Sequence, residues 1–190
     1  MSIDFYFDFS SPFGYLASQK IDALAGRHGR TVTWRPMLLG AAFKATGGVP
    51  LTQIPLKGEY SKRDFYRSAR FHGLEYKHPE LFPVSTVSAC RAFYSLKNDQ
   101  EAVRLAKALF RAYFHDNLNI GEPDNVMRIA AATGVDANIN DQAVKDRTKA
   151  EVDAALAKGV FGSPYVIVDG EPFWGLDRFD QVDRWLKAPF

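Results

Sequence analysis

The N-terminal segment joins a strand directly to the start of a helix. Apolar side chains occupy every second position of residues 3–9, a period of two that is typical of a β-strand. Ser11 then precedes Pro12, and a serine N-cap followed by proline in the first turn predicts a helix that ends near Gly26. A β-branched and aromatic run over residues 31–35 predicts a second strand. The chain therefore begins β-α-β, and we expect two parallel strands joined by a right-handed crossover.

The C-terminal segment returns to β-structure. Strand-like runs over residues 165–168 and 171–174 flank the pair Asp169-Gly170, which favours a tight primed turn. An amphipathic pattern over residues 176–186 then predicts a closing helix.

The segment between these two ends has mainly helical patterns. An irregular stretch rich in glycine and proline comes first, and helices are then predicted over residues 59–71, 85–96, 101–114, 123–133 and 141–158. Without this block, the remaining βαβ and ββα units have the element order of thioredoxin. We therefore predict an α/β, thioredoxin-like domain made of residues 1–37 and 160–190. Residues 38–159 would form an all-helical insertion domain that covers the ligand face of this scaffold.

Composition and charge narrow the classes of partner. The 190 residues are 46% hydrophobic and 24% charged, as in a globular domain, and the net charge of +2 is too small to indicate nucleic acid. No segment approaches the roughly 18 apolar residues of a membrane span, and the N-terminus lacks the pattern of a signal peptide. The four histidines show no metal-ligand spacing. We expect a cytoplasmic protein that binds neither nucleic acid, membrane nor metal.

The segment Ser11-Pro12-Phe13-Gly14 lies where thioredoxin-like oxidoreductases carry Cys-x-x-Cys. Serine and glycine stand at the two cysteine positions, so dithiol–disulfide exchange is excluded. Cys90 is the single cysteine, and its helical, apolar surroundings predict a buried structural thiol. Ser11 either serves as an ordinary N-cap or also donates a hydrogen bond to a ligand thiolate, and the two roles are compatible.

Two further motifs near the C-terminus allow both a structural and a functional interpretation. Ser163-Pro164 precedes a strand, where a proline is either an ordinary turn residue or the cis-proline of thioredoxin-like ligand sites. Asp177 either caps the last helix or binds an ammonium group beside the start of that helix.

Three segments, FYFDFSSPFGYLAS, WRPMLLGAAFKATGG and FGSPYVIVDGEPFWGLDRF, resemble the 2-hydroxychromene-2-carboxylate isomerases. That family is related to the kappa-class glutathione transferases, within the DsbA-like group of thioredoxin folds. The resemblance implies glutathione as cofactor, with Ser11 at its sulfur and with Ser163 and a cis Pro164 on its backbone. It also implies that Lys57 approaches the glycyl end and that Asp177 binds the γ-glutamyl ammonium.

The sequence departs from the kappa-type pattern at two positions. Gly48 stands where kappa-type sequences often carry asparagine, and Leu176 stands where they carry serine. Each replacement removes one side chain that could hydrogen-bond glutathione.

The activity implied by the resemblance is an isomerisation. Reversible addition of a thiolate would interconvert 2-hydroxychromene-2-carboxylate and trans-o-hydroxybenzylidenepyruvate, or a close aromatic analogue. The open alternatives are a kappa-type transferase that releases a glutathione conjugate and a non-catalytic thioredoxin-like binding module. The resemblance further implies a homodimer. Candidate contacts for the substrate are the cations Arg35, Lys44 and Arg67 and the aromatic residues Phe13, Phe43 and Trp174.

Overall fold

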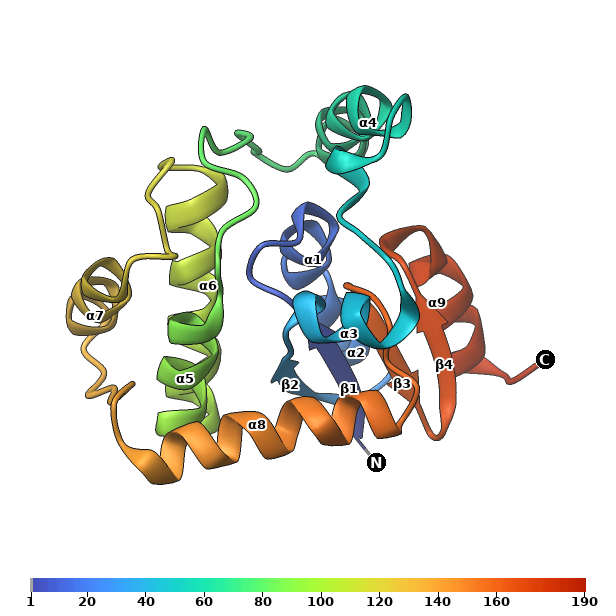
Figure 1. The fold of residues 1–190 in the computed structure, drawn as a ribbon. Coiled ribbons are helices and arrows are strands. Elements are labelled where there is room, and N and C mark those ends of the chain that lie inside the picture. The colour runs from blue at the N-terminus through green and yellow to red at the C-terminus, as the bar shows by residue number, and fades with distance from the viewer. Residues whose placement is uncertain (1) are drawn as a thin grey trace.

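The computed structural model describes residues 2–190, which form a mixed four-stranded sheet surrounded by helices (Figure 1). The strands are β1 (Ser2–Phe7), β2 (Thr31–Pro36), β3 (Tyr165–Val168) and β4 (Glu171–Trp174), in the order β2-β1-β3-β4. β1 is parallel to β2 and antiparallel to β3, and β3 forms an antiparallel hairpin with β4. This arrangement confirms the predicted thioredoxin-like fold, including the parallel first pair.

The helices follow the predicted order with three differences. The first predicted helix is divided into α1 (Pro12–Ser18) and α2 (Ile21–Arg27). At this break, the Ser18 hydroxyl donates a hydrogen bond to the carbonyl of Tyr15 at 2.6 Å. Such a side-chain bond gives the carbonyl a partner other than a helical backbone N–H. The sequence patterns also missed α3 (Leu39–Thr46) and the 3₁₀ turn η1 (Leu51–Gln53). A second 3₁₀ turn, η2 (Leu176–Arg178), precedes the last helix α9 (Phe179–Lys187).

The predicted helical block contains five longer helices at nearly the expected positions. They are α4 (Lys57–Phe71), α5 (Val87–Ser95), α6 (Asp99–Phe114), α7 (Pro123–Ala132) and α8 (Gln142–Ala157). Among the described residues, no helix combines the length and the apolarity that a membrane crossing requires.

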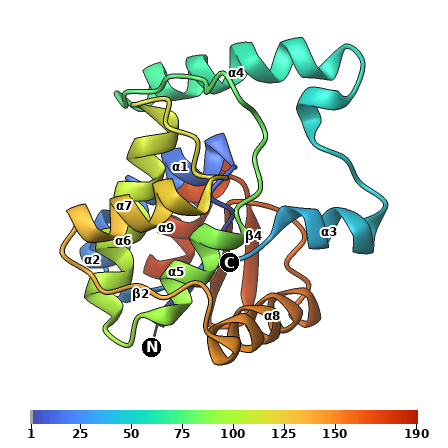
Figure 2. The ribbon, with the colours of Figure 1, turned by 60° about the vertical axis from the view of Figure 1, so that its left-hand side comes forward.

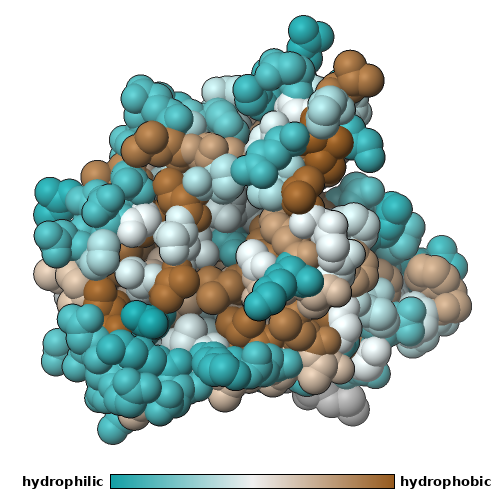
Figure 3. Space-filling view, viewed as in Figure 1, coloured by the Kyte–Doolittle hydropathy of each residue, from teal (hydrophilic) through white to brown (hydrophobic). Residues whose placement is uncertain are grey.

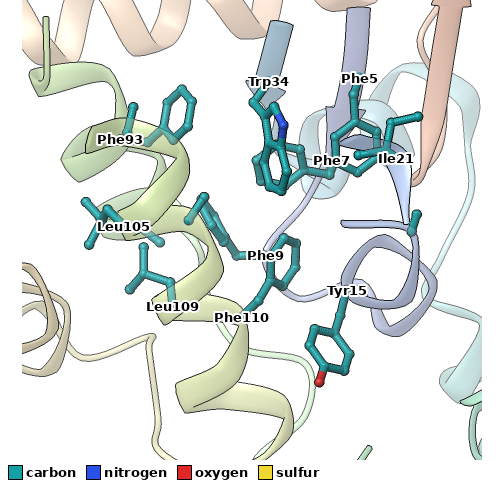
Figure 4. Packing of buried hydrophobic residues seen from close by; sticks show 14 of the residues in the cluster. Phe5, Phe7, Phe9, Tyr15, Ile21, Trp34, Phe93, Leu105, Leu109 and Phe110 are labelled. Carbon is teal, nitrogen blue, oxygen red and sulfur yellow. The ribbon is translucent and has the colours of Figure 1, made fainter. Parts of the chain in front are cut away.

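The core lies on both faces of β1. Phe5 and Phe7 point to one face, where Phe7 contacts Trp34 of β2 and Phe110 of α6 with ring centroids 5.4 Å apart in each case (Figure 4). Tyr6 points to the other face and packs in a smaller cluster with Ala155 of α8. The first cluster continues from the sheet into the helical block. One continuous core joins the two predicted parts, and their division into separate domains stays a prediction.

Helix α4 lies above α1 in both views of the ribbon (Figures 1 and 2). Phe13 of α1 meets Phe65 of α4 edge-on, with ring centroids 5.1 Å apart. The segment that leads into α4 is open to solvent, and the side chain of Leu56 is 94% exposed. We call residues 49–60 the arm, because they lead from α3 to the helix above α1.

Candidate functional site

Ser11 occupies the junction between β1 and α1. Its hydroxyl oxygen accepts a hydrogen bond from the backbone N–H of Gly14 at 3.0 Å, which confirms the N-cap interpretation. The same hydroxyl donates to the carbonyl oxygen of Ser163 at 2.9 Å, although the two residues are 152 positions apart. Ser11 is 5% exposed. The first helix start is therefore bound directly to the loop before β3.

That loop contains the predicted cis peptide bond between Ser163 and Pro164, which confirms the cis interpretation. The hydroxyl of Ser163 accepts a hydrogen bond from the backbone N–H of Asp8 at 2.9 Å, and the carbonyl of Pro164 accepts one from Gly175 at 3.0 Å. The N–H of Ser163 itself has no hydrogen-bond partner among residues 2–190. One backbone donor beside the cis-proline is thus available to a ligand.

Gly14 permits the close approach of these two segments. A β-carbon at this position would lie 2.7 Å from the hydroxyl oxygen of Ser163 and 3.0 Å from the β-carbon of Ser11. The position that carries the second cysteine in redox-active relatives of the fold is therefore so close to Ser163 that a side chain here would require the two segments to separate. Residue type excludes disulfide exchange, and the packing in addition disfavours a larger residue at position 14.

The β4 end of the site carries an exposed aromatic residue and a carboxylate. Trp174 is 56% exposed and lies against Gly162, where an added β-carbon would be 2.2 Å from the indole nitrogen. The carboxylate of Asp177 folds back over Gly175 and forms an ion pair with Arg178 at 3.2 Å. Asp177 caps neither η2 nor α9, so the capping interpretation is wrong. Its carboxylate is exposed beside the loop that holds Pro164.

Lys57 is the first residue of α4 and is exposed. In the described part of the chain, no hydrogen bond or ion pair joins its ammonium group to Ser11, Ser163 or Asp177. The structure therefore brings Ser11, Ser163, Pro164 and Asp177 to the same edge of the scaffold and places Lys57 on the arm. Its contact with a ligand stays a prediction.

Comparisons with known proteins identify the family and the fold. A family model described as DSBA-like thioredoxin domain matches residues 2–187. A 2-hydroxychromene-2-carboxylate isomerase from Sphingobium xenophagum is 32% identical, with 97% of both chains covered. The chain belongs to this isomerase family within the DSBA-like group. A solved structure of a 2-hydroxychromene-2-carboxylate isomerase has a TM-score of 0.88 at 26% identity and covers 98% of this chain and 95% of its own.

The isomerase family is not the only group of relatives. A protein named glutathione S-transferase kappa 1 from Caenorhabditis elegans is 27% identical over 98% of this chain and 91% of its own. The relationship to kappa-class transferases that the sequence resemblance implied is thereby confirmed. Leu176, one of the two departures from the kappa-type pattern, is a buried core residue and offers no hydrogen bond.

The structure distinguishes the three candidate cations for a substrate of this isomerase-family chain. Arg35 bonds Asp4 at 2.9 Å and lies 3.5 Å from Glu151, and Arg67 is paired with Asp64. Lys44, exposed on α3, has no ion-pair partner among the described residues. A cation already paired with a carboxylate is a poorer receptor for a second anion, so the pairing favours Lys44.

Sequence reasoning missed Asp8, which is the most buried carboxyl group near the site. Asp8 is 3% exposed, and burial raises the pKa of its carboxyl. Its backbone carbonyl accepts from Ser11 at 2.9 Å, and its N–H donates to Ser163. Asp8 follows directly after β1, and the contacts that bury it come from Leu39 and Thr86, which are far away in the chain. The alternation over residues 3–9 leaves Asp8 between two apolar positions and gives no sign of this burial.

The remaining candidate groups of the sequence have structural roles or none. Cys90 is fully buried, which confirms the predicted buried thiol, and burial raises the pKa of that thiol well above the ordinary value. Within residues 2–190, no cluster of three or more potential ligands of the His, Cys, Asp or Glu type is present.

Proposed function

We propose that this chain is a glutathione-dependent isomerase of 2-hydroxychromene-2-carboxylate or a close aromatic analogue, acting by reversible thiolate addition. The observation that carries the proposal is the bond between the Ser11 hydroxyl and the Ser163 carbonyl, 2.9 Å long, beside a cis-proline. It places a hydroxyl donor and the unpartnered Ser163 N–H next to each other. A ligand with a sulfur and an extended peptide backbone matches these two donors.

The residues of the site fit glutathione in chemical type. The N–H and C=O of Ser163 can pair with a peptide group, as a strand pairs with an added strand. Arg178 pairs with one oxygen of the exposed Asp177 carboxylate, and the other oxygen suits the γ-glutamyl ammonium. The ammonium of Lys57 suits a terminal carboxylate. The relatives named glutathione S-transferase kappa support the same choice of ligand. Bound glutathione would supply a thiolate that adds to the substrate and leaves again, so that a double bond becomes free to rotate.

The task of this chain is to keep that sulfur ionised. Lowering the pKa of a thiol from about 8.5 to about 6.5 requires about 2.7 kcal/mol of preferential stabilisation of the anion. A hydrogen bond from a hydroxyl to an anion contributes about 1.5–3 kcal/mol. A helix start contributes about 0.3–2 kcal/mol, and the seven residues of α1 place this chain at the lower end. The Ser11 hydroxyl is therefore the larger contributor.

The face that would receive the aromatic substrate is apolar. Figure 3 shows brown, apolar side chains at the centre of the same view as Figure 1, with hydrophilic side chains along α8 below them. Phe13 is half-buried at the start of α1, and Phe43 is half-buried on α3 beside Lys44. An aromatic carboxylate requires an apolar wall and one cation, and α3 offers both from neighbouring positions.

The decisive experiment is the Ser11→Ala variant, with Ser18→Ala as the matched control. Ser18 lies in the same helix, is 1% exposed and likewise donates to a backbone carbonyl. Each variant loses about 1–2 kcal/mol of stability from one lost hydrogen bond and, for Ser11, one lost cap. Only Ser11→Ala should raise the pKa of bound glutathione, read from the ultraviolet absorbance of its thiolate, and lower turnover by at least about tenfold.

Two results would contradict the proposal. Calorimetry that shows no glutathione binding to the wild-type protein would favour the non-catalytic binding module. Full turnover by Ser11→Ala at neutral pH would leave Ser11 as an N-cap only.

A kappa-type transferase is the second candidate, and the 27% identity to a kappa transferase over 98% of this chain favours it. Incubation with glutathione and a chlorinated nitroaromatic compound separates the two activities. A stable conjugate, with glutathione consumed, supports transfer. Conversion of the chromene carboxylate with glutathione unchanged supports isomerisation.

We also infer that the chain forms a homodimer through the arm. Its exposed side chains include Leu56 at 94%, Tyr60 at 61% and Val49 at 51%. Several large apolar side chains that are open to solvent on one short segment are typical of an interface. A second copy of the chain is the partner that the family resemblance implies.

A further inference from the structure

The carboxylate of Asp8 is the meeting point of four hydrogen bonds from three segments. One oxygen accepts from the N–H of Ser10 at 2.7 Å, from the Ser10 hydroxyl at 2.8 Å and from the hydroxyl of Thr86 at 3.1 Å. The other oxygen accepts from the N–H of Leu39 at 2.7 Å. Two of these four donors are backbone N–H groups, which can only donate.

Two of these bonds reach the segments that enter and leave the arm and α4. Leu39 is the first residue of α3, and the N-cap position of α3, Leu38, has no capping side chain. Asp8 therefore serves as the cap of α3 from another part of the chain, by satisfying a backbone N–H that no neighbour satisfies. Thr86 is the N-cap residue of α5, and its hydroxyl is given to Asp8 instead of to its own helix.

The main chain of Asp8 reaches the site itself. Its carbonyl accepts from the N–H of Ser11 at 2.9 Å, and its N–H donates to the hydroxyl of Ser163 at 2.9 Å. Ser10, held twice by the carboxylate, is the residue immediately before Ser11. Asp8 thus fixes the position of the Ser11 hydroxyl relative to Ser163 through its bonds to Ser10, Ser11 and Ser163.

We propose that Asp8 is a positioning residue of the glutathione site, which sets the location of the Ser11 hydroxyl and couples it to α3 and α5. The inference rests on the proposed function. Asp8 does not touch the reacting atoms, so it acts through Ser11 and Ser163. Loss of the Asp8 carboxylate should keep every residue that contacts the ligand but misalign the Ser11 hydroxyl that faces the sulfur.

Asp8 could act on the thiol by positioning Ser11 or through its negative charge, and the two effects have opposite signs. The titratable groups that face it are the thiol of Cys90 on α5 and the phenol of Tyr113 on α6, and neither carries positive charge. Among the described residues, no lysine, arginine or histidine bonds the carboxylate. A negative charge near a thiolate opposes its ionisation, so removal of the charge alone would lower the thiol pKa. Misalignment of Ser11 would raise it.

The test is the Asp8→Asn variant, with the thiolate absorbance of bound glutathione followed against pH. Asparagine keeps the volume but presents an NH₂ group to at least one backbone N–H, so one of the four bonds fails. We expect the pKa of the bound thiol to rise by about one unit and kcat to fall about tenfold. An unchanged pKa would mean a purely structural role, and a lowered pKa would mean simple charge repulsion. Either result overturns the proposal.

A matched pair of threonine variants decides the question even where Asp8→Asn does not fold. Thr86 and Thr148 are both 4% exposed, and the Thr148 hydroxyl bonds only within α8, to the carbonyl of Val144 at 2.8 Å. Thr86→Val should raise the pKa of the bound thiol by about half a unit, and Thr148→Val should leave it unchanged. Equal values for the two variants would overturn the proposal. Absence of glutathione binding by the wild-type protein would instead refute the proposed function, and this inference with it.

Discussion

The substitution Gly14→Ala tests whether the contact between α1 and the cis-proline loop is as close as the structure shows. The added β-carbon would lie 2.7 Å from the hydroxyl oxygen of Ser163, well inside the 3.4 Å at which ordinary contact begins. That hydroxyl cannot move aside without cost, because it accepts the N–H of Asp8 at 2.9 Å. The two segments must therefore separate to accommodate the methyl group.

Two opposing effects set the magnitude. Alanine in place of glycine in a helix gains about 0.5–1 kcal/mol. Insertion of a methyl group into a packed contact costs about 1–3 kcal/mol, so the net loss lies between about 0 and 2.5 kcal/mol. Gly26 in α2 provides the control, because a β-carbon there would meet nothing within 4 Å. Gly26→Ala should show the gain of about 0.5–1 kcal/mol alone.

Urea unfolding measures both free energies, and calorimetry measures the affinity for glutathione. Gly14→Ala should weaken binding about tenfold, equivalent to about 1.4 kcal/mol, because Ser11 and Ser163 no longer face one ligand together. Ser163→Ala removes the clashing oxygen, so Gly14→Ala should cost less stability in the Ser163→Ala background than in the wild type. A Gly14→Ala protein that is stabilised like Gly26→Ala and binds glutathione unchanged would refute the close contact.

Two further predictions concern parts of the chain away from this contact. Cys90 is fully buried, and burial raises the pKa of its thiol. In urea, N-ethylmaleimide should therefore label Cys90 no faster than the protein unfolds. Rapid labelling of the native protein would contradict this. Leu56→Lys should convert a dimer to a monomer in sedimentation equilibrium, because a charge would replace an exposed apolar side chain of the arm. A mass unchanged from the wild type would exclude the arm as the interface.

The features that the sequence predicted well depend on a few consecutive residues. The turn at Asp169-Gly170 has positive φ angles of 51° and 95°, as a primed hairpin turn requires at both central positions. Ser11 is the N-cap that the Ser-Pro pattern predicted, and the Ser163-Pro164 bond is cis. The turn and the N-cap follow from local backbone chemistry, and the surrounding fold agrees with it. The cis bond followed only from the family resemblance, because the residues alone left an ordinary turn proline open.

The features that the sequence did not predict depend on residues far apart in the chain. Asp8 is buried because α3 and α5 both begin against it, and no pattern within β1 records those contacts. Arg35 is unsuitable as a free cation because Asp4 bonds it across the sheet. Asp177 is of a residue type that often caps helices, but it lies inside the 3₁₀ turn η2, and α9 begins only after that turn. Such outcomes follow from tertiary packing, which overrides local preference.

The hydrogen-bond inventory of Ser11 implies that the ligand must bring a peptide N–H as well as a sulfur. Ser11 has a single hydroxyl proton, and the free protein gives it to the carbonyl of Ser163. Turning that proton toward a thiolate leaves the Ser163 carbonyl without a donor, at a cost of about 1–3 kcal/mol. A ligand whose backbone N–H replaces the hydroxyl at this carbonyl removes the cost. A small thiol without an amide group does not.

Glutathione and 2-mercaptoethanol should therefore differ in the pKa of the bound thiol and not only in affinity. We expect the wild-type protein to lower the pKa of glutathione by about two units and to leave the pKa of 2-mercaptoethanol unchanged at saturating concentration. The same absorbance titration measures both thiols. In Ser11→Ala the Ser163 carbonyl is always free for the ligand, so the two thiols should behave alike. Equal lowering of both pKa values by the wild-type protein would show that the hydroxyl proton is not shared between carbonyl and sulfur.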